Sequence, residues 1–441
     1  MMEWQSALAL MLGGLFCFMG MGLPVVFAFL GINLVGAWFF LGEEAGLAQW
    51  VRNSTSALTH FSLTPIPLFV WMGEILLQSG LAFRAIGAIE RLIDRVPGKL
   101  SIVTILGGTT FATLSGASIA NTAMMGRVML PEMLQRGYHP SMSMGPIMAV
   151  GGIAMLIPPS ALGVMLGSLA GISIEGLLVG GILPALLMAM LFLGYVVLRS
   201  CWRPQDAPMG STESSSELTH WARWRPFLRH VVPLLGIFVA VVGSMFAGWA
   251  SPTESAAIGA MASLLAALVY RAMSWSAFWK SLIETAKVSG VILFVLAAST
   301  TFSQLLSFSG ASAGFLGLIQ SMNVSAPMLV AGMLLILLLL GMVMDQISMM
   351  MVCLPFFMPL ANAAGVDPVW LGVMMLIAME IGLLTPPFGL LLLVMQSVAP
   401  AGIQLSQVYR AAFPFILLEL LLLLMVFGWP ALAVWLPGLM S

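Results

Sequence analysis

Long apolar runs alternate with short polar breaks along most of the chain, and the breaks carry proline, glycine or charged residues. A helix needs about 20 consecutive apolar residues to cross the hydrocarbon core of a bilayer. The chain offers about ten runs of that length, the first from about Trp4 to Met21. The pattern therefore predicts an all-α polytopic membrane protein with about ten transmembrane helices.

The polar breaks recur in a fixed register, which indicates an internal duplication. Four features reappear 228 positions later: Pro131, Gly137, Pro140 and the Pro158–Pro159 pair return as Pro359, Gly365, Pro368 and Pro386–Pro387. We therefore predict a first repeat at residues 1–199 and a second at residues 230–441. A hydrophilic linker at residues 200–229 joins them.

Each repeat contains a segment that is too polar or too broken for a simple span. Residues 101–135 are rich in serine, threonine and glycine, and residues 326–363 are their counterpart. We predict that both are re-entrant helical hairpins, which exist at membrane depth only where protein or an aqueous cavity surrounds them. The double prolines predict broken helices at residues 140–170 and 368–398, because each proline removes a backbone donor.

The distribution of basic residues predicts how the repeats are oriented. Arg84, Arg91 and Lys99 follow the third apolar run, and such clusters lie on the cytoplasmic side. No lysine or arginine occurs between Val288 and Tyr409, so the second hairpin is expected to enter from the opposite side. The two repeats would then form an inverted-topology pair. Arg52 is an exception, because this scheme places it outside.

Composition excludes several other classes of protein. With 60% hydrophobic and 7% charged residues and a mean hydropathy of +1.06, the chain has too little polar surface for a water-soluble particle. A net charge of −1 argues against a nucleic-acid partner. The chain has no His-Glu-x-x-His or Gly-Lys-Ser/Thr motif, which argues against an intramembrane metalloenzyme and an ATP-driven pump. A secondary transporter and an ion channel remain.

Several polar residues fall near the middle of the membrane. They are Ser115, Ser118, Asn121 and Arg127 in the first hairpin, Asp345, Gln346 and Ser348 in the second, and Thr385 beside the second proline pair. Their oxygens and the free carbonyls at helix breaks suit a hard cation such as Na⁺, while the N-termini of half-helices suit an anion. We therefore predict two cation sites with an anionic substrate between them.

Each of these residues also has a purely structural interpretation. Serine and glycine pack membrane helices closely, and Arg127 could extend to the interface. Glu74 and Glu380 could be buried hydrogen-bonding groups. Asp345 is the strongest candidate for a cation ligand, because an acid deep in a membrane is costly without a role.

The same residues carry a family resemblance over nearly the whole chain. The runs SGASIANTAMMGRVMLPEMLQRGYHP, IPPS, SPTESAAIG, MDQI, GVDPVW and EIGLLTPPFGL resemble the large membrane subunit of a tripartite ATP-independent periplasmic (TRAP) transporter. The resemblance implies a sodium-coupled, elevator-type importer of an organic acid anion in the bacterial inner membrane. It also implies a small four-helix membrane subunit and a periplasmic binding protein that delivers the substrate. A stand-alone sodium- or proton-coupled anion cotransporter of similar design is the alternative.

Carried onto this sequence, the resemblance implies two Na⁺ sites. The first would use Ser115, Gly116, Ser118 and Asn121 with the backbone near Gly152 and Pro158, and the second Asp345, Thr385, the backbone before Pro386, and Gly389. Ser118, Arg127, Gln346 and Ser348 are the candidates for substrate binding. Asp345 aligns with Ala117, so the first site would have only neutral oxygens and helix dipoles. Either it binds a cation more weakly, or the arriving substrate supplies the negative charge.

Overall fold

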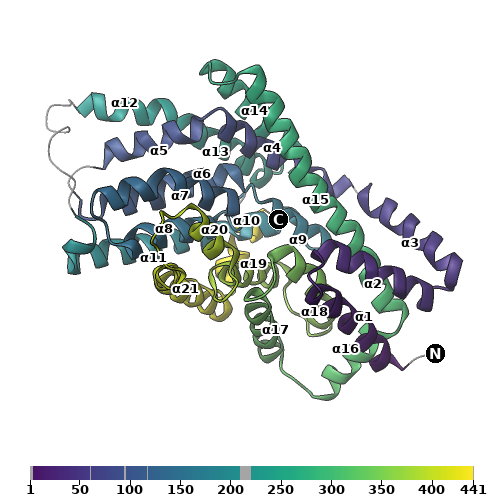
Figure 1. The fold of residues 1–441 in the computed structure, drawn as a ribbon. Coiled ribbons are helices and arrows are strands. Elements are labelled where there is room, and N and C mark those ends of the chain that lie inside the picture. Colours follow the sequence, from purple (N-terminus) through teal and green to yellow (C-terminus); the bar gives the residue numbers. More distant parts are fainter. Residues whose placement is uncertain (1–2, 60, 94–95, 117, 209–219, 441) are drawn as a thin grey trace.

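The computed structural model describes residues 3–59, 61–93, 96–116, 118–208 and 220–440, and these form helices and connecting turns without any strand (Figure 1). The helices of residues 3–208 are α1 (Trp4–Gly20), α2 (Val25–Phe40), α3 (Glu43–Leu58), η1 (Phe61–Leu63), α4 (Pro65–Gln78), α5 (Leu81–Leu92), α6 (Lys99–Ser115), α7 (Ser118–Gln135), α8 (Pro140–Ile153), α9 (Ala161–Ala170), α10 (Ile174–Gly180), α11 (Ile182–Trp202) and η2 (Pro204–Asp206). The helices of residues 220–440 are α12 (His220–His230), α13 (Val232–Phe246), α14 (Pro252–Val269), α15 (Trp275–Phe308), α16 (Ala311–Ser321), α17 (Ala326–Gly341), α18 (Gln346–Ala363), α19 (Pro368–Leu384), α20 (Leu390–Val398), α21 (Leu405–Gly428) and α22 (Ala431–Gly438).

The prediction of an all-α membrane protein is confirmed. Among the described residues, seven helical stretches are long and apolar enough to cross a bilayer, and five shorter apolar helices of 10–17 residues accompany them. The shorter ones include α9, α17 and α19, which lie beside the breaks in the chain.

The helix bounds follow the 228-residue register. Helices α7 and α18 begin at Ser118 and Gln346, and α8 and α19 begin at Pro140 and Pro368. The second helices, α2 and α14, match to within one residue, because they begin at Val25 and Pro252. Ser251 and Glu254 form a capping box at the start of α14. Part of the predicted 200–229 linker is helical, since α12 begins at His220.

One pair of segments differs between the repeats. The first repeat interrupts the chain between α3 and α4, whereas α15 is one uninterrupted helix of 34 residues. Pro65 and Pro67 begin α4, but the positions 228 residues later are Leu293 and Val295. Proline lacks the backbone donor and crowds the preceding turn, so only the first repeat has to start a new helix there.

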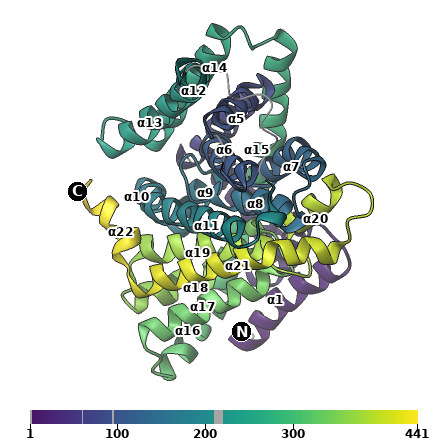
Figure 2. The ribbon, with the colours of Figure 1, turned by 90° about the vertical axis from the view of Figure 1, so that its left-hand side faces the viewer.

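The helices form two groups according to how they pack. The outer group consists of α2, α3, α4, α13, α14 and α15, in which α15 packs on α2, α3 and α4, and α14 packs on α4 and α13. The central group consists of the two hairpins and the broken helices, with α8 and α19 packed against α21. Figures 1 and 2 show α15 crossing the molecule obliquely, with α5, α12, α13 and α14 gathered at one end.

The central group is densely buried because small residues let its backbones approach. Every residue of α8 from Met142 to Ile153 is buried, and so is every residue of α19 from Leu371 to Leu384. An ideal Cβ at Gly341 would lie 2.6 Å from the Cα of Gly382, so α17 and α19 meet backbone to backbone. Glycine at such crossings is the usual basis of close packing in membrane helices.

We predict that Gly341→Ala lowers the thermal unfolding temperature of the purified protein. The added methyl group would push α17 away from α19, and overpacking of this kind costs about 1–3 kcal/mol. The matched control is Gly332→Ala in the same helix, where an ideal Cβ meets no atom within 4 Å. Equal unfolding temperatures for the two variants would contradict the close contact.

Candidate functional site

The tip of the first hairpin lies against the break in the first broken helix. Helix α6 ends at Ser115, and Gly116 follows with a φ of 59°, in the left-handed region that favours glycine. An ideal Cβ at Gly116 would lie 2.5 Å from the carbonyl oxygen of Pro159. Gly116 is thus in close contact with the Pro158–Pro159 segment. The Ser115 side chain and Ala117 lie outside the described residues.

Three polar side chains lie on the face of α7 that packs against Val150 and Gly151 of α8, just before this break. Ser118, Asn121 and Thr122 are all buried, at positions that share a helix face. The Asn121 Nδ2 donates to the carbonyl oxygen of Val150 at 3.3 Å. Asn121 Oδ1, Ser118 Oγ and Thr122 Oγ1 have no hydrogen-bond partner among the described residues. Because buried polar atoms normally have a partner, these three oxygens are candidates for ligands of a cation.

The glycines of α8 allow this face of α7 to approach α8 closely. The carbonyl oxygen of Ser118 would lie 3.1 Å from an ideal Cβ at Gly151, and the Thr122 hydroxyl is closer still. Thr122 was absent from the residues predicted for the site. Its sequence signal was the four-residue spacing from Ser118, which places both on one face of a helix.

A carboxyl group from the second repeat reaches the same region. Glu380 of α19 is fully buried, and an ideal Cβ at Gly152 would lie 2.9 Å from its Cγ and 3.0 Å from its Oε1. Both oxygens of Glu380 lack a hydrogen-bond partner among the described residues. Glu419 of α21 is also fully buried, and neither of its oxygens has a partner in the described part of the chain. A charge in such surroundings requires compensation by a cation or a proton.

Glu74, the other acid left open by the sequence, has a hydrogen bond. Its Oε2 accepts from the Nε2 of Gln78 at 3.0 Å, one turn further along α4. This contact confirms the structural interpretation for Glu74 alone.

The tip of the second hairpin is organised by Asp345, which caps the N-terminus of α18. Its Oδ2 accepts from the backbone N–H groups of Ile347 at 3.1 Å and Ser348 at 3.3 Å. Its Oδ1 accepts from the Ser348 hydroxyl. An ionised carboxylate has about four lone-pair sites, so a cation ligand and a helix cap are compatible roles.

The second break brings carbonyl oxygens together around a glycine. An ideal Cβ at Gly389 would lie 2.5 Å from the oxygen of Leu383 and 2.9 Å from that of Thr385. The Thr385 hydroxyl donates to the Ile381 carbonyl at 2.6 Å. Thr385 and Pro386 are half-buried, whereas the whole first break from Ala154 to Ser160 is buried.

No hydrogen bond links Asp345 to Thr385 in the described part of the chain. What connects this hairpin to α19 is the Gly341–Gly382 contact, three residues before Thr385. Of the four predicted members of the second site, Asp345 therefore lies at the hairpin cap. Thr385, Pro386 and Gly389 lie in the oxygen-rich turn.

The residues predicted to bind substrate lie in two different environments. Gln346 and Ser348 are buried at the start of α18, as Ser118 is at the start of α7. Arg127 is exposed, nine residues further along α7 or about two and a half turns. Its guanidinium forms no ion pair with any described residue.

The breaks of the two repeats interlock. An ideal Cβ at Gly126 of α7 would lie 2.6 Å from Cγ2 of Val398 in α20, and α18 packs on α9.

Within the described residues no group of three or more histidine, cysteine, aspartate or glutamate side chains could hold a metal ion. A cation here would instead be held by hydroxyl, amide and carbonyl oxygens with single carboxylates, which are ligands for hard cations.

The fold is that of known membrane transporters. The YdaH transporter of Alcanivorax borkumensis matches with a TM-score of 0.63 and 16% identity, covering 89% of this chain and 91% of that one. MtrF of Neisseria gonorrhoeae, described as an antimetabolite efflux pump, matches with a TM-score of 0.61 and 14% identity, covering 92% of this chain and 94% of that one. At these identities the likeness concerns the fold alone.

The family follows from sequence comparison. Residues 12–432 match the family model described as "Tripartite ATP-independent periplasmic transporter, DctM component", and the chain belongs to this family. It is 32% identical over 426 residues to the 2,3-diketo-L-gulonate TRAP transporter large permease protein YiaN of Escherichia coli, covering 96% of both chains. It is 30% identical over 380 residues to the C4-dicarboxylate protein DctM of Pseudomonas aeruginosa (86% and 87%) and 28% identical over 421 residues to the ectoine/5-hydroxyectoine protein UehC of Ruegeria pomeroyi (95% and 96%). These relatives are transporter permease subunits rather than enzymes, so the resemblance read from the sequence is confirmed.

Proposed function

We propose that this protein is the large membrane subunit of a sodium-coupled importer of an organic acid anion. A periplasmic binding protein would deliver the substrate, and a small four-helix subunit would complete the transporter in the bacterial inner membrane. The observation that carries the proposal is the set of buried oxygens of Ser118, Asn121 and Thr122 beside the first helix break, which have no partner among the described residues. The alternative is a stand-alone sodium- or proton-coupled anion cotransporter of the same fold.

The first break supports a Na⁺ site made largely of neutral oxygens. Ser118 Oγ, Asn121 Oδ1 and Thr122 Oγ1 have no partner among the described residues, and the Thr122 hydroxyl and the Ser118 carbonyl lie against Gly151. The backbone near Gly116, Gly152 and Pro158 would complete the site. Glu380 adds a carboxyl group from the second repeat. A cation bound at this junction would compensate both the unpartnered oxygens and the buried acid.

The second break supports a Na⁺ site formed by Asp345 with Thr385, the backbone before Pro386, and Gly389. The Leu383 and Thr385 carbonyls already converge on Gly389. Asp345 would approach them when the hairpin tip moves toward the break. Cation binding would then bring together two elements that no hydrogen bond joins at present.

Between the two sites, the N-termini of α7 and α18 suit an anion. The helix dipole favours negative charge at both ends, although Asp345 already accepts from two of the N–H groups of α18. Ser118, Gln346 and Ser348 lie there and would contact a carboxylate, and Arg127 would attract it from further along α7. A substrate anion and the two cations would each stabilise the other's site, which is the physical basis of coupled transport.

The division into an outer and a central group supports an elevator mechanism with inverted repeats. The outer group would remain fixed as a scaffold, and the central group would carry both breaks across the membrane. The relatives named for diketogulonate, C4-dicarboxylates and ectoine support small organic acids as the substrate class.

Uptake into proteoliposomes tests the proposal. The chain is reconstituted with its small membrane subunit, and a radiolabelled organic acid is added with or without the cognate binding protein and a Na⁺ gradient. We expect saturable uptake only when all components and inward Na⁺ are present. Uptake without the binding protein would favour the stand-alone cotransporter, and non-saturable flux would favour a channel.

We predict that Asp345→Asn folds normally but loses most Na⁺-dependent uptake. The amide oxygen of asparagine still caps α18, but the side chain no longer offers a negative charge to a cation. Asp345→Ala should lose uptake and also about 0.5–2 kcal/mol of stability through the missing cap. Thermal unfolding and Na⁺ titration of uptake separate the two effects. Normal Na⁺ dependence in Asp345→Asn would leave Asp345 as a cap only.

We predict that Asn121→Ala raises the Na⁺ concentration needed for half-maximal uptake several-fold. It removes one ligand oxygen, and roughly 1.4 kcal/mol of lost cation binding corresponds to a tenfold change. Asn362→Ala is the control, because Asn362 is an exposed asparagine near the end of α18. An unchanged Na⁺ requirement in Asn121→Ala would assign Asn121 to helix packing.

A further inference from the structure

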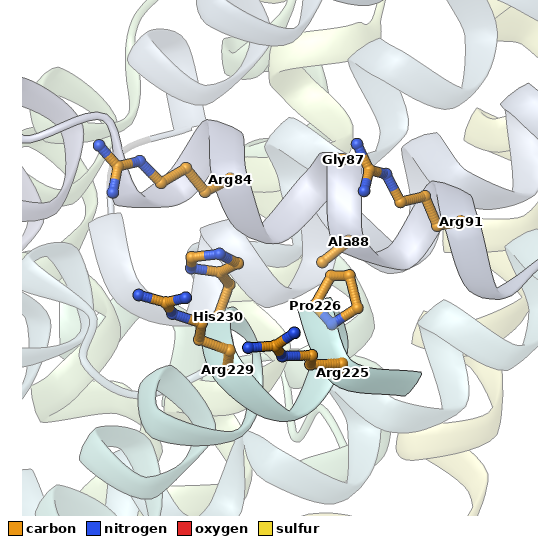
Figure 3. A pocket seen from close by; sticks show the side chains of 8 residues that line it. All are labelled: Arg84, Gly87, Ala88, Arg91, Arg225, Pro226, Arg229 and His230. Atoms are coloured by element: carbon orange, nitrogen blue, oxygen red, sulfur yellow. The ribbon is translucent and has the colours of Figure 1, made fainter. Parts of the chain in front are cut away.

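A strongly basic pocket lies between α5 and α12, away from the helix breaks. The pocket is a cavity of about 340 Å³ lined by Arg84 and Arg91 of α5 and by Arg225, Arg229 and His230 of α12. Figure 3 shows these side chains coming from the two facing helices. None of them takes part in the site proposed for transport.

The positive charge of this pocket is not balanced by the described part of the protein. The four arginines are exposed, and none of them forms an ion pair with a described carboxylate. Glu90 on α5 lies 3.8 Å from Arg136 instead. The Nδ1 of His230 is buried and has no hydrogen-bond partner among the described residues. Both observations indicate room for an anionic ligand.

The spacing of the arginines along the sequence places each pair on one face of its helix. Arg84 and Arg91 are seven residues apart and share one face of α5, and Arg225 and Arg229 are four apart and share one face of α12. Like charges at a spacing of four residues repel each other and destabilise a helix. A bound anion would turn this repulsion into attraction.

The surroundings of the pocket are those of a membrane interface. Helix α12 leads directly into α13, and the stretch Arg223–Phe246 is apolar enough to span a bilayer. Trp221, Trp224 and Leu228 on α12 and Phe83 on α5 are exposed. Tryptophan favours the boundary between lipid headgroups and hydrocarbon, and arginine-rich segments beside spans lie on the cytoplasmic side. A ligand here would therefore meet both charge and apolar surface.

We propose that this pocket binds the phosphate group of an anionic glycerophospholipid. The guanidinium groups of arginine bind phosphate oxygens in a bidentate manner, and basic pockets beside membrane helices accept such headgroups. The acyl chains would lie along the exposed apolar side chains of α5 and α12. The lipid would thereby fasten α5 to α12 and hold the adjoining helix α13 at a fixed depth. Free phosphate has the same headgroup chemistry but no chains.

The proposal is tested on the purified full-length chain in detergent, by native mass spectrometry and by thermal unfolding. The probes are cardiolipin or phosphatidylglycerol, phosphatidylcholine as the zwitterionic lipid, and inorganic phosphate. The test variant is Arg84→Gln/Arg225→Gln. Its control is Lys280→Gln/Arg410→Gln, which removes the same charge at exposed positions outside the pocket.

We expect the wild type and the control to retain anionic lipid and to unfold several degrees higher in its presence. The test variant should retain at least fivefold less lipid and lose this shift. A second variant, Arg84→Lys/Arg225→Lys, keeps the charge but not the bidentate geometry, so it should fold and bind lipid at an intermediate level.

Three results would overturn the proposal. The first is equal retention of anionic lipid by the test and control variants. The second is a full stability shift with inorganic phosphate alone, which would assign the pocket to a soluble anion. The third is cross-linking of the pocket to the small membrane subunit with loss of bound lipid, which would assign it to a protein partner.

Discussion

Backbone groups that leave a helix inside a membrane need partners, and this requirement determines how the centre of the protein is built. The chain breaks its helices four times near the core, at the two hairpin tips and the two proline pairs. Three of these breaks are buried or capped: Gly116 lies on the Pro159 carbonyl, and Asp345 caps α18, whereas Thr385 and Pro386 at the fourth are half-buried. Non-helical backbone is tolerated at membrane depth only under such conditions. The oxygens at these places that have no partner among the described residues are therefore the positions at which we propose that cations bind.

The two repeats contribute unequally to this centre. Both hairpins and both broken helices follow one plan, but the acids Asp345, Glu380 and Glu419 all come from the second repeat. Glu380 lies against Gly152 of the first broken helix, so the first site is less neutral than its own sequence indicates. From the sequence, this proposed site either binds a cation more weakly or takes its negative charge from the substrate, and Glu380 is a further source of negative charge beside it. The two repeats therefore share their geometry but differ in where their acidic residues lie.

Most of the architecture could be predicted from the sequence because its signals are local. Prolines at fixed positions end helices, Ser251 and Glu254 start one, and apolar runs of sufficient length define spans. The candidate site was only partly predictable, because its contacts join distant segments. Nothing near Gly152 in the sequence indicates Glu380. Helix α12 was not predicted for another reason. Its arginines and tryptophans have the composition of a polar linker, and the surface of α5 on which it packs comes from a distant part of the sequence.

The interlocking of the repeats also limits how the protein can move. Gly126 of the first hairpin lies against Val398 beyond the second break, and Gly152 beyond the first hairpin lies against Glu380. A motion that carried one break without the other would open both contacts and expose a buried acid. Packed interiors do not deform continuously, because each contact depends on close fit. In the elevator mechanism proposed above, the two breaks would therefore move together, and the outer group would be the surface against which they slide.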